Sequence, residues 1–245
     1  MKTWLKYLSV TTGIAVAVLS ILPANNLAQT SETYRPPKGK VREQTRKAGG
    51  SRGCNMPLED AVTLLVPQNH TATTISERPT FFWHLSQKLS LPLRFTLLEP
   101  GKKPILTKEL KPEPGIVALK LPQDTAPLEV GKTYRWTVTV VCNPSKPSRN
   151  LFAQAWIERV PLPTEAQLSN NTKNTSFCSL SYARAGIWYD ALSCNYTTLA
   201  KKQNNHNNSW QQFRSLLEEI GLAYLAQQTS ALSLTDGHIS KQAKS

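Results

Sequence analysis

The sequence contains few of the signatures that identify an enzyme. It lacks the nucleophile motif Gly-x-Ser-x-Gly, the zinc motif His-Glu-x-x-His, a phosphate-binding glycine loop and the ligand ladder of an EF-hand. Only four histidines are present, and no two have the sequence spacing of metal ligands. We therefore predict no cofactor and no metal site. We interpret the histidines as surface residues: His84 on the outward side of a strand, His70 and His206 in loops, and His238 in the tail.

Acidic side chains are scarce relative to basic ones. The 245 residues include 16 Asp and Glu against 29 Lys and Arg, which gives a net charge of +13. Such an excess indicates nucleic-acid binding when the basic residues cluster on a folded surface. Here seven of them lie between residues 35 and 52, among prolines and glycines and without helix or strand periodicity. We therefore expect residues 29–53 to form a disordered basic linker, and we expect no nucleic-acid partner.

The basic linker has two interpretations. Clustered Lys and Arg side chains add about 1 kcal/mol each at an anionic surface. Arg42, Arg46 and Lys47 are therefore candidate contacts to anionic lipid, to an acidic polymer or to an acidic patch on a partner. The alternative is a linker that only keeps the chain soluble.

Long apolar runs are absent except at the N-terminus. Residues 1–28 combine a basic start, an uncharged apolar run from Leu8 to Leu22 and a short polar end, which is typical of a secretory signal peptide. The run is shorter and more polar than the ~20 residues that a membrane-spanning helix needs. Cleavage after Ala28, or after Ala24, is therefore favoured over a membrane anchor. We expect an exported protein, periplasmic or extracellular, with no transmembrane segment in the mature chain.

From Cys54 onwards apolar residues recur with a period of two, and turn residues interrupt them at short intervals. This pattern is typical of antiparallel β structure. We predict an α+β protein in which residues 54–160 form a seven-strand antiparallel β-sandwich of the fibronectin type III or immunoglobulin type. The strands are expected at 59–66, 79–85, 92–98, 104–110, 115–121, 133–142 and 151–159.

One turn within this module has a specific sequence. Residues 128–134 read LEVGKTY and resemble the tyrosine corner of fibronectin type III domains. In that turn Gly131 supplies the bend, and the hydroxyl of Tyr134 hydrogen-bonds to the backbone upstream. Trp83 in the second predicted strand fits the same topology. These three residues are expected to have structural roles.

The four cysteines lack the Cys-x-x-Cys spacing of zinc sites, and an even number in an exported protein favours disulfides. If the seven strands alternate in direction, the first begins and the sixth ends at the same pole, which predicts a Cys54–Cys142 disulfide. Pairing of Cys178 with Cys194 stays open. One continuous helix would separate them by ~24 Å, so either the helix starts near Arg184 or the two thiols do not pair.

Residues 161–227 are predicted to form a helical hairpin packed on the sandwich. The first helix is expected over 179–200. The second is marked by a capping box at Ser209 and by Gly221, which suits the left-handed position after a helix. Residues 228–245 are expected to be a disordered tail.

Phe152 and Trp156 point to the outer side of the last predicted strand. Exposed aromatic residues are found on platforms that bind carbohydrate or peptide, so these two are the candidate binding residues. The alternative, which the pattern favours, is that they receive the appended helices in a second small core.

Asp190 lies among aromatic residues in the segment GIWYDAL and is the one candidate for a general base. A carboxylate in such a place more often caps a backbone group or pairs with an arginine such as Arg184. We interpret Asp190 as a structural residue.

Several segments together resemble a known family. They include GGSRGC (49–54), PTFFWHL (79–85), APLEVGKTYRWTVTVVCNP (126–144) and GIWYDAL (186–192). In their order and spacing they are similar to the exported cyanobacterial family catalogued as domain of unknown function 928, over about residues 49–225. The resemblance implies a cell-envelope or extracellular location, a two-part domain with no assigned activity, and a role in surface assembly.

These inferences lead to one main prediction about function. We expect a non-catalytic binding or scaffolding protein of the cell envelope that recognises a protein or polysaccharide partner. The alternative is a hydrolase or transferase that acts on envelope polymers through Asp190.

Overall fold

A computed structural model describes residues 34–37, 42, 44–49, 54, 60–162, 175–200, 206–228 and 234–236. The chain divides into one unit over residues 1–31 and a second over residues 32–245, and all of the described residues belong to the second. The predicted signal peptide of residues 1–28 lies outside the described residues.

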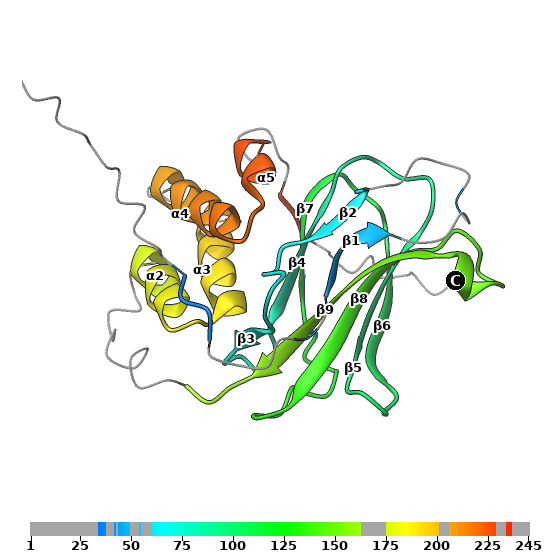
Figure 1. The fold of residues 1–245 in the computed structure, drawn as a ribbon, viewed down its shortest axis with the longest axis horizontal. Coiled ribbons are helices and arrows are strands. Elements are labelled where there is room, and N and C mark those ends of the chain that lie inside the picture. The colour runs from blue at the N-terminus through cyan, green and yellow to red at the C-terminus, as the bar shows by residue number, and fades with distance from the viewer. Residues whose placement is uncertain are drawn as a thin grey trace, which may run out of the picture. The chain divides into compact units, whose positions relative to one another are not determined.

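Ten strands are described (Figure 1). They are β1 (Thr45–Gly49), β2 (Val62–Leu64), β3 (Ala72–Thr74), β4 (Thr80–Leu85), β5 (Leu93–Leu98), β6 (Pro104–Leu110), β7 (Gly115–Lys120), β8 (Thr133–Val140), β9 (Leu151–Arg159) and β10 (Leu234–Asp236). The helices are the 3-10 turn η1 (Pro147–Arg149), α2 (Thr175–Arg184), α3 (Trp188–Ala200), α4 (His206–Glu219) and α5 (Ala223–Gln228). Each of the seven strand ranges expected from the sequence contains a strand, and β1, β3 and β10 are additional.

The strands form one continuous sheet, mostly antiparallel, in the order β10-β7-β4-β2-β1-β9-β8-β5-β6, with β3 paired to β9. Strand β1 joins the group β7-β4-β2 to the group β9-β8-β5-β6. The α+β class is therefore correct. The expected seven strands, however, belong to a larger sheet that β1 makes continuous, and they do not form two separate sheets.

The sheet folds over an aromatic core. Strands β4 and β5 are five steps apart along the sheet, which at ~4.8 Å per step is about 24 Å in a flat sheet. The rings of Phe81 in β4 and Phe95 in β5 nevertheless lie 5.0 Å apart, and Phe81 lies 5.2 Å from Trp136 in β8. The two strand groups therefore face each other. Full burial of such side chains stabilises a fold by about 1.5–3 kcal/mol each.

Two segments expected to be disordered contain strands. Within the predicted linker of residues 29–53, Thr45–Gly49 forms β1, and Tyr34 is buried with 4% of its surface exposed. Within the predicted tail of residues 228–245, Leu234–Asp236 forms β10 beside β7. Backbone pairing with strands already in the sheet orders both segments, and such pairing leaves little apolar periodicity in the sequence.

The first expected helix is two helices, α2 and α3, with a turn at Gly186. Gly186 has a φ of +77°, its N–H donates to the carbonyl of Ala183, and the N–H of Ile187 donates to the carbonyl of Tyr182. This pair of bonds is a Schellman motif, which ends α2 and reverses the chain. The expectation of one continuous helix over residues 179–200 is therefore wrong.

Helix α4 begins three residues before Ser209, the expected N-cap, and it ends at Glu219, where the sequence predicts. It starts at His206, so Ser209 lies inside the helix and is buried, and the predicted capping box is wrong. At its end the N–H of Gly221 donates to the carbonyl of Glu218, and the N–H of Leu222 donates to that of Leu217. These bonds form the expected left-handed ending at Gly221.

Helix α3 packs on β3 and β4. The indole N–H of Trp188 donates to the carbonyl of Leu65 (2.8 Å), and the rings of Tyr196 and Phe82 meet edge to face at 5.4 Å. Phe152 in β9, in contrast, is 41% exposed. The helices therefore join the main buried cluster through residues such as Phe82, and since neither Phe152 nor Trp156 belongs to that cluster, the expectation that these two receive the helices in a second core is not met.

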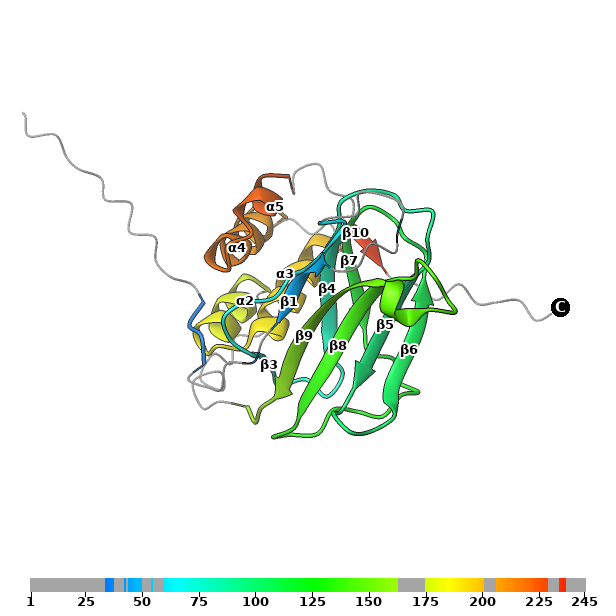
Figure 2. The ribbon, with the colours of Figure 1, turned by 45° about the vertical axis from the view of Figure 1, so that its right-hand side comes forward.

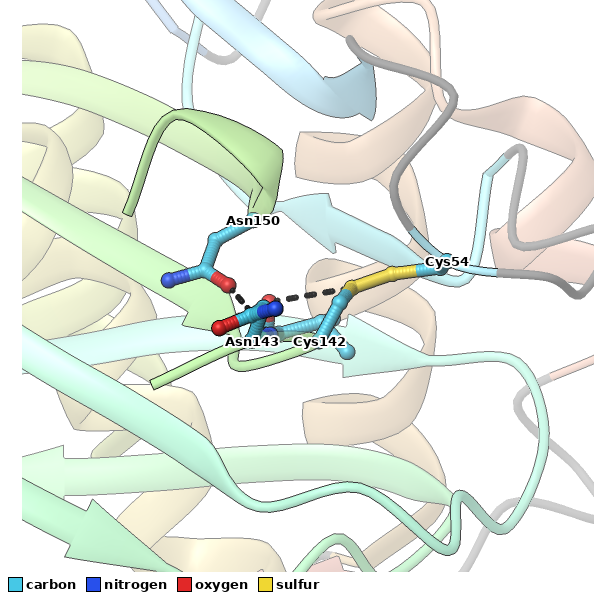
Figure 3. The surroundings of a disulfide bond; sticks show 5 residues. Cys54, Cys142, Asn143 and Asn150 are labelled. Carbon is cyan, nitrogen blue, oxygen red and sulfur yellow. Dashed lines mark hydrogen bonds between the residues drawn. A yellow bond between two sulfur atoms is a disulfide. The ribbon is translucent and has the colours of Figure 1, made fainter. Parts of the chain in front are cut away.

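Both cysteine pairs are disulfides. Cys54 and Cys142 have Cα atoms 5.3 Å apart, and Figure 3 shows them beside Asn143, whose backbone N–H donates to the side chain of Asn150 (2.9 Å). Cys178 and Cys194 have Cα atoms 6.3 Å apart. The turn at Gly186 brings this second pair together, because it places α2 beside α3.

Candidate functional site

The strands β9, β8, β5 and β6 have an outer face that is open to solvent. Along β5, β8 and β9 the residues alternate between buried and partly exposed, and the partly exposed set forms this outer face. Figure 2 shows the four strands side by side, with the helices to one side of them.

Strand register arranges the outer face in rows. At one end of the face Phe152 lies opposite Thr139, and at the other end Trp156 lies opposite Arg135. The row between them consists of hydroxyl and amide side chains on five adjacent strands: Thr45, Gln154, Thr137, Thr96 and Thr107. The outer face therefore combines aromatic rings with many hydrogen-bonding groups.

Arg42 reaches Trp156 from the segment before β1. Its guanidinium carbon lies 4.7 Å from the centroid of the Trp156 ring, within the range of a cation–π interaction. Trp156 is half-buried and Phe152 is exposed. Of the five residues predicted to bind a partner, Arg42 and Trp156 are therefore in contact, and Phe152 lies on the same face at its other end.

The other two predicted binding residues contact the protein itself. The guanidinium of Arg46 donates to the carbonyl of Ile220 at the end of α4 (2.6 Å). The ammonium of Lys47 pairs with the carboxylate of Asp60 (2.8 Å) and lies 5.5 Å from the ring centroid of Tyr224. These contacts attach β1 to its surroundings, which is a structural role for both residues.

A second polar cluster, which sequence analysis missed, surrounds His70. Its Nδ1 donates to the side-chain oxygen of Asn69 (2.8 Å), and its Nε2 accepts from the hydroxyl of Tyr34 (2.7 Å). Burial lowers the pKa of His70 and raises the pKa of Tyr34, so both side chains are neutral at pH 7. The expectation that His70 is a surface residue is wrong, because Tyr34 covers it.

A pocket of about 670 Å³ lies beside this cluster. It is lined by Tyr34, Pro36, Gln68, Asn69, His70, Glu219, Ile220 and Gly221. The carboxylate of Glu219 accepts from the backbone N–H of Tyr34 (2.6 Å). Tyr34 and His70 are almost fully buried and bonded to each other, so they form the floor of the pocket and offer no free reactive group.

Asp190 connects the first turn of α3 to β3. Its carboxylate accepts from the hydroxyl of Thr74 (2.7 Å) and from the backbone N–H of Ile75 (3.2 Å). Burial raises the pKa of Asp190 to about 6, although both hydrogen bonds act in the opposite direction. Of the two structural roles expected from the sequence, the bond to the backbone of Ile75 matches the capping of a backbone group, whereas the alternative pairing with Arg184 is not the one formed.

His84 is a further ionisable residue considered from the sequence. His84 in β4 is buried with 4% exposure, so the expectation that it is a surface residue is wrong, and burial lowers its pKa. Among the described residues, no three His, Cys, Asp or Glu side chains lie close enough together to hold a metal ion.

No described helix has the length and apolar character that crossing a bilayer requires.

The residues assigned structural roles lie in the core or in turns. The hydroxyl of Tyr134 accepts from the backbone N–H of Glu129 (2.8 Å), five residues upstream, which is the bond of a tyrosine corner. Gly131 in that turn has a φ of +78°. Trp83 is fully buried, with its ring 6.2 Å from that of Phe95.

Comparison with known proteins places the chain in a family. The family described as Domain of Unknown Function (DUF928) matches residues 47–230. The chain belongs to this family. No curated protein and no solved structure matches this DUF928 chain. The matched range begins inside β1 and includes α5, so it contains Phe152, Arg135 and Trp156, whereas Tyr34 and Arg42 precede it.

Proposed function

We propose that this DUF928 protein is an exported, non-catalytic binding protein of the cell envelope that uses the outer face of β9 and β8 to recognise a protein or polysaccharide partner. The observation that carries the proposal is the exposure of Phe152 on a face where Trp156 and Arg42 also lie. An exposed aromatic side chain beside polar groups is characteristic of binding surfaces.

Two features support export. The N-terminal 28 residues have the composition of a secretory signal peptide. All four cysteines are in disulfides, which persist in oxidising compartments and are rare in the cytosol. A cyanobacterial periplasm or cell exterior is the location we propose.

Two local features shared with fibronectin type III sandwiches support a binding role, although the strands here belong to one continuous sheet. The tyrosine corner at Tyr134 and the two facing strand groups are features of such sandwiches. Sandwiches of this kind present flat sheet faces and loops to partners. This similarity of fold is secondary to the residues of the outer face, because function depends on the site.

Catalysis through Asp190 has less support. One oxygen of its carboxylate, Oδ2, already accepts from Thr74 and Ile75, and the group is largely buried at the junction of α3 and β3. A general base needs a free lone pair directed at a substrate. The outer face therefore remains the preferred functional site.

The test is affinity capture from an envelope extract with the mature chain as bait. We expect Phe152→Ser to reduce capture of the bound partner at least tenfold, because exposed aromatic residues dominate such contacts. Val130→Ser is the matched control, since Val130 is also exposed (51%) but lies in the tyrosine-corner turn. Equal capture by the Phe152→Ser variant and the unmodified protein would contradict the proposal.

A further inference from the structure

We propose that the outer face binds an acidic polysaccharide, with Arg42 and Arg135 holding a carboxylate of a uronic-acid unit beside Trp156. This inference rests on the proposed function, because it names the chemical class of partner for the same face. Three observations carry it: the placement of the two arginines, the row of hydroxyl and amide groups, and the backbone pairing of β8 and β9.

The positive charge of the face is concentrated at Trp156. The guanidinium of Arg42 lies against its ring, and Arg135 is its cross-strand neighbour, so both cations lie at the same end of the face. Within the described part of the chain neither arginine has a carboxylate partner. Arg94, an arginine of β5 on this face, is paired with Glu109 (3.0 Å), so that pair adds no net charge.

Among the described residues, an acidic side chain on β9 bears on the direction of the ligand. Glu158 lies two positions beyond Trp156 on β9, opposite Thr133. It would repel an anion on that side. On the other side of Trp156 lie Gln154 and Thr137, which are neutral hydrogen-bonding groups. We therefore expect the polysaccharide to place one carboxylate at the two arginines and to extend from Trp156 towards Phe152.

The length and chemistry of this path fit a chain of sugars. Phe152 and Trp156 are four residues apart on one strand, which corresponds to about 13 Å. Between them lies the row of hydroxyl and amide side chains, which can donate to and accept from sugar hydroxyl groups. The exposed ring of Phe152 offers an apolar surface for the face of a further sugar ring.

The backbone of the face disfavours an extended peptide as the occupant. Strand β9 is paired with both β1 and β8, and β8 is paired with both β9 and β5. Neither strand has a free edge, so a peptide cannot add to the sheet there through main-chain hydrogen bonds. Recognition over β8 and β9 must therefore use side chains, and those present match a hydroxyl-rich anionic polymer.

The direct test is titration calorimetry of the mature, disulfide-bonded chain with alginate oligosaccharides, whose units are uronic acids. Dextran oligosaccharides of equal length serve as the neutral probe. We expect alginate to bind at least ten times more tightly than dextran and its affinity to fall with rising salt concentration. Arg135→Gln should weaken alginate binding about tenfold, as expected for the loss of a hydrogen bond to a charged group.

Two further variants connect the effect to the geometry. Arg42→Gln and Trp156→Leu should each weaken alginate binding, and the double variant should be little worse than either one, because Trp156 acts by holding Arg42 in place. Arg184→Gln is the control, since it removes the same charge from an exposed position at the end of α2. Thermal unfolding confirms that each variant is folded.

Different results separate this inference from the proposed function. In one outcome dextran and alginate bind equally well, Arg135→Gln has no effect, and Phe152→Ser abolishes binding of both glycans. That outcome overturns the proposal of an acidic ligand but supports the outer face as the binding site. The same holds if neither glycan binds while an envelope protein is captured through Phe152. If Phe152→Ser changes nothing and alginate binding also survives Arg135→Gln, both proposals fail.

Discussion

At the scale of single residues, Asp190 shows how burial couples a carboxylate to the stability of the fold. Its pKa of about 6 in the folded protein exceeds the ordinary value near 3.8. Between these two values the folded chain keeps a proton that the unfolded chain has lost, so the stabilisation that Asp190 provides is present at low pH and is lost as the pH rises through 6.

We predict that Asp190→Asn removes this dependence. The amide oxygen of asparagine can still accept from Thr74 and Ile75, so the contacts of the carboxylate are kept. Relative to the unmodified protein, the variant should gain about 2–3 kcal/mol of unfolding free energy between pH 3.5 and pH 7.5. Urea unfolding at several pH values measures this gain. Asp124→Asn, at an exposed position, is the control, and a similar pH profile in both variants would contradict the assignment.

Two glycines with similar φ angles are predicted to differ in their tolerance of alanine. A Cβ at Gly221 meets nothing within 4 Å, so Gly221→Ala costs only the left-handed strain of about 1–2 kcal/mol. A Cβ at Gly186 lies 2.8 Å from the backbone oxygen of Arg35, so Gly186→Ala also has to displace that segment. Denaturant unfolding should show a clearly larger loss for Gly186→Ala, and equal losses would argue against the contact with Arg35.

The same pair shows what sequence analysis can and cannot recover. Gly221 follows a helical pattern and precedes Leu222, and it was predicted as a helix end. Gly186 precedes Ile187 in the same way, yet apolar residues continue with helical spacing on both sides of it. Because helical spacing continues across Gly186, the pattern of apolar residues does not reveal the turn between α2 and α3. A search for glycine followed by an apolar residue finds both Schellman motifs.

At the scale of whole elements, the strands that sequence analysis found and missed differ in how they are ordered. Strands β5 and β8 alternate strictly between buried and partly exposed residues, and that alternation is visible in the sequence. Strand β1 contains one buried apolar residue, Ala48, and owes its order to pairing with β2 and β9. The strands that pair with β1 are distant from it in the sequence, so the composition of residues 29–53 alone indicates a linker.

We predict that β1 protects the tryptic sites after Arg46 and Lys47. A paired strand resists proteolysis until it opens locally, whereas a linker is cut at once. Ala48→Asp places a carboxylate at a buried position and should increase cleavage at both sites at least tenfold, which limited proteolysis with mass spectrometry measures. Thr45→Asp, at a partly exposed position of the same strand, should change the rate much less. Rapid cutting of the unmodified protein at Arg46 would contradict a stable β1.

At the scale of the whole molecule, the candidate site depends on contacts that only the fold creates. The alternation of β9 was sufficient to predict that Phe152 and Trp156 face outward. The row of hydroxyl groups across five strands was not predictable, because it depends on strand order and register. The position of Arg42 on Trp156 likewise follows from β1, which brings the preceding segment back to β9.

The two disulfides stabilise the molecule to different extents, and this difference leads to a last prediction. Cys54–Cys142 joins residues 88 apart and encloses β2 to β8, whereas Cys178–Cys194 joins residues only 16 apart within the α2–α3 hairpin. In the chain-entropy model the first contributes about 4–5 kcal/mol and the second about 3 kcal/mol. We expect the double variant Cys54→Ala/Cys142→Ala to lose more unfolding free energy than Cys178→Ala/Cys194→Ala in urea denaturation. The reverse order would mean that packing around the helical hairpin, rather than closure of the long loop, dominates.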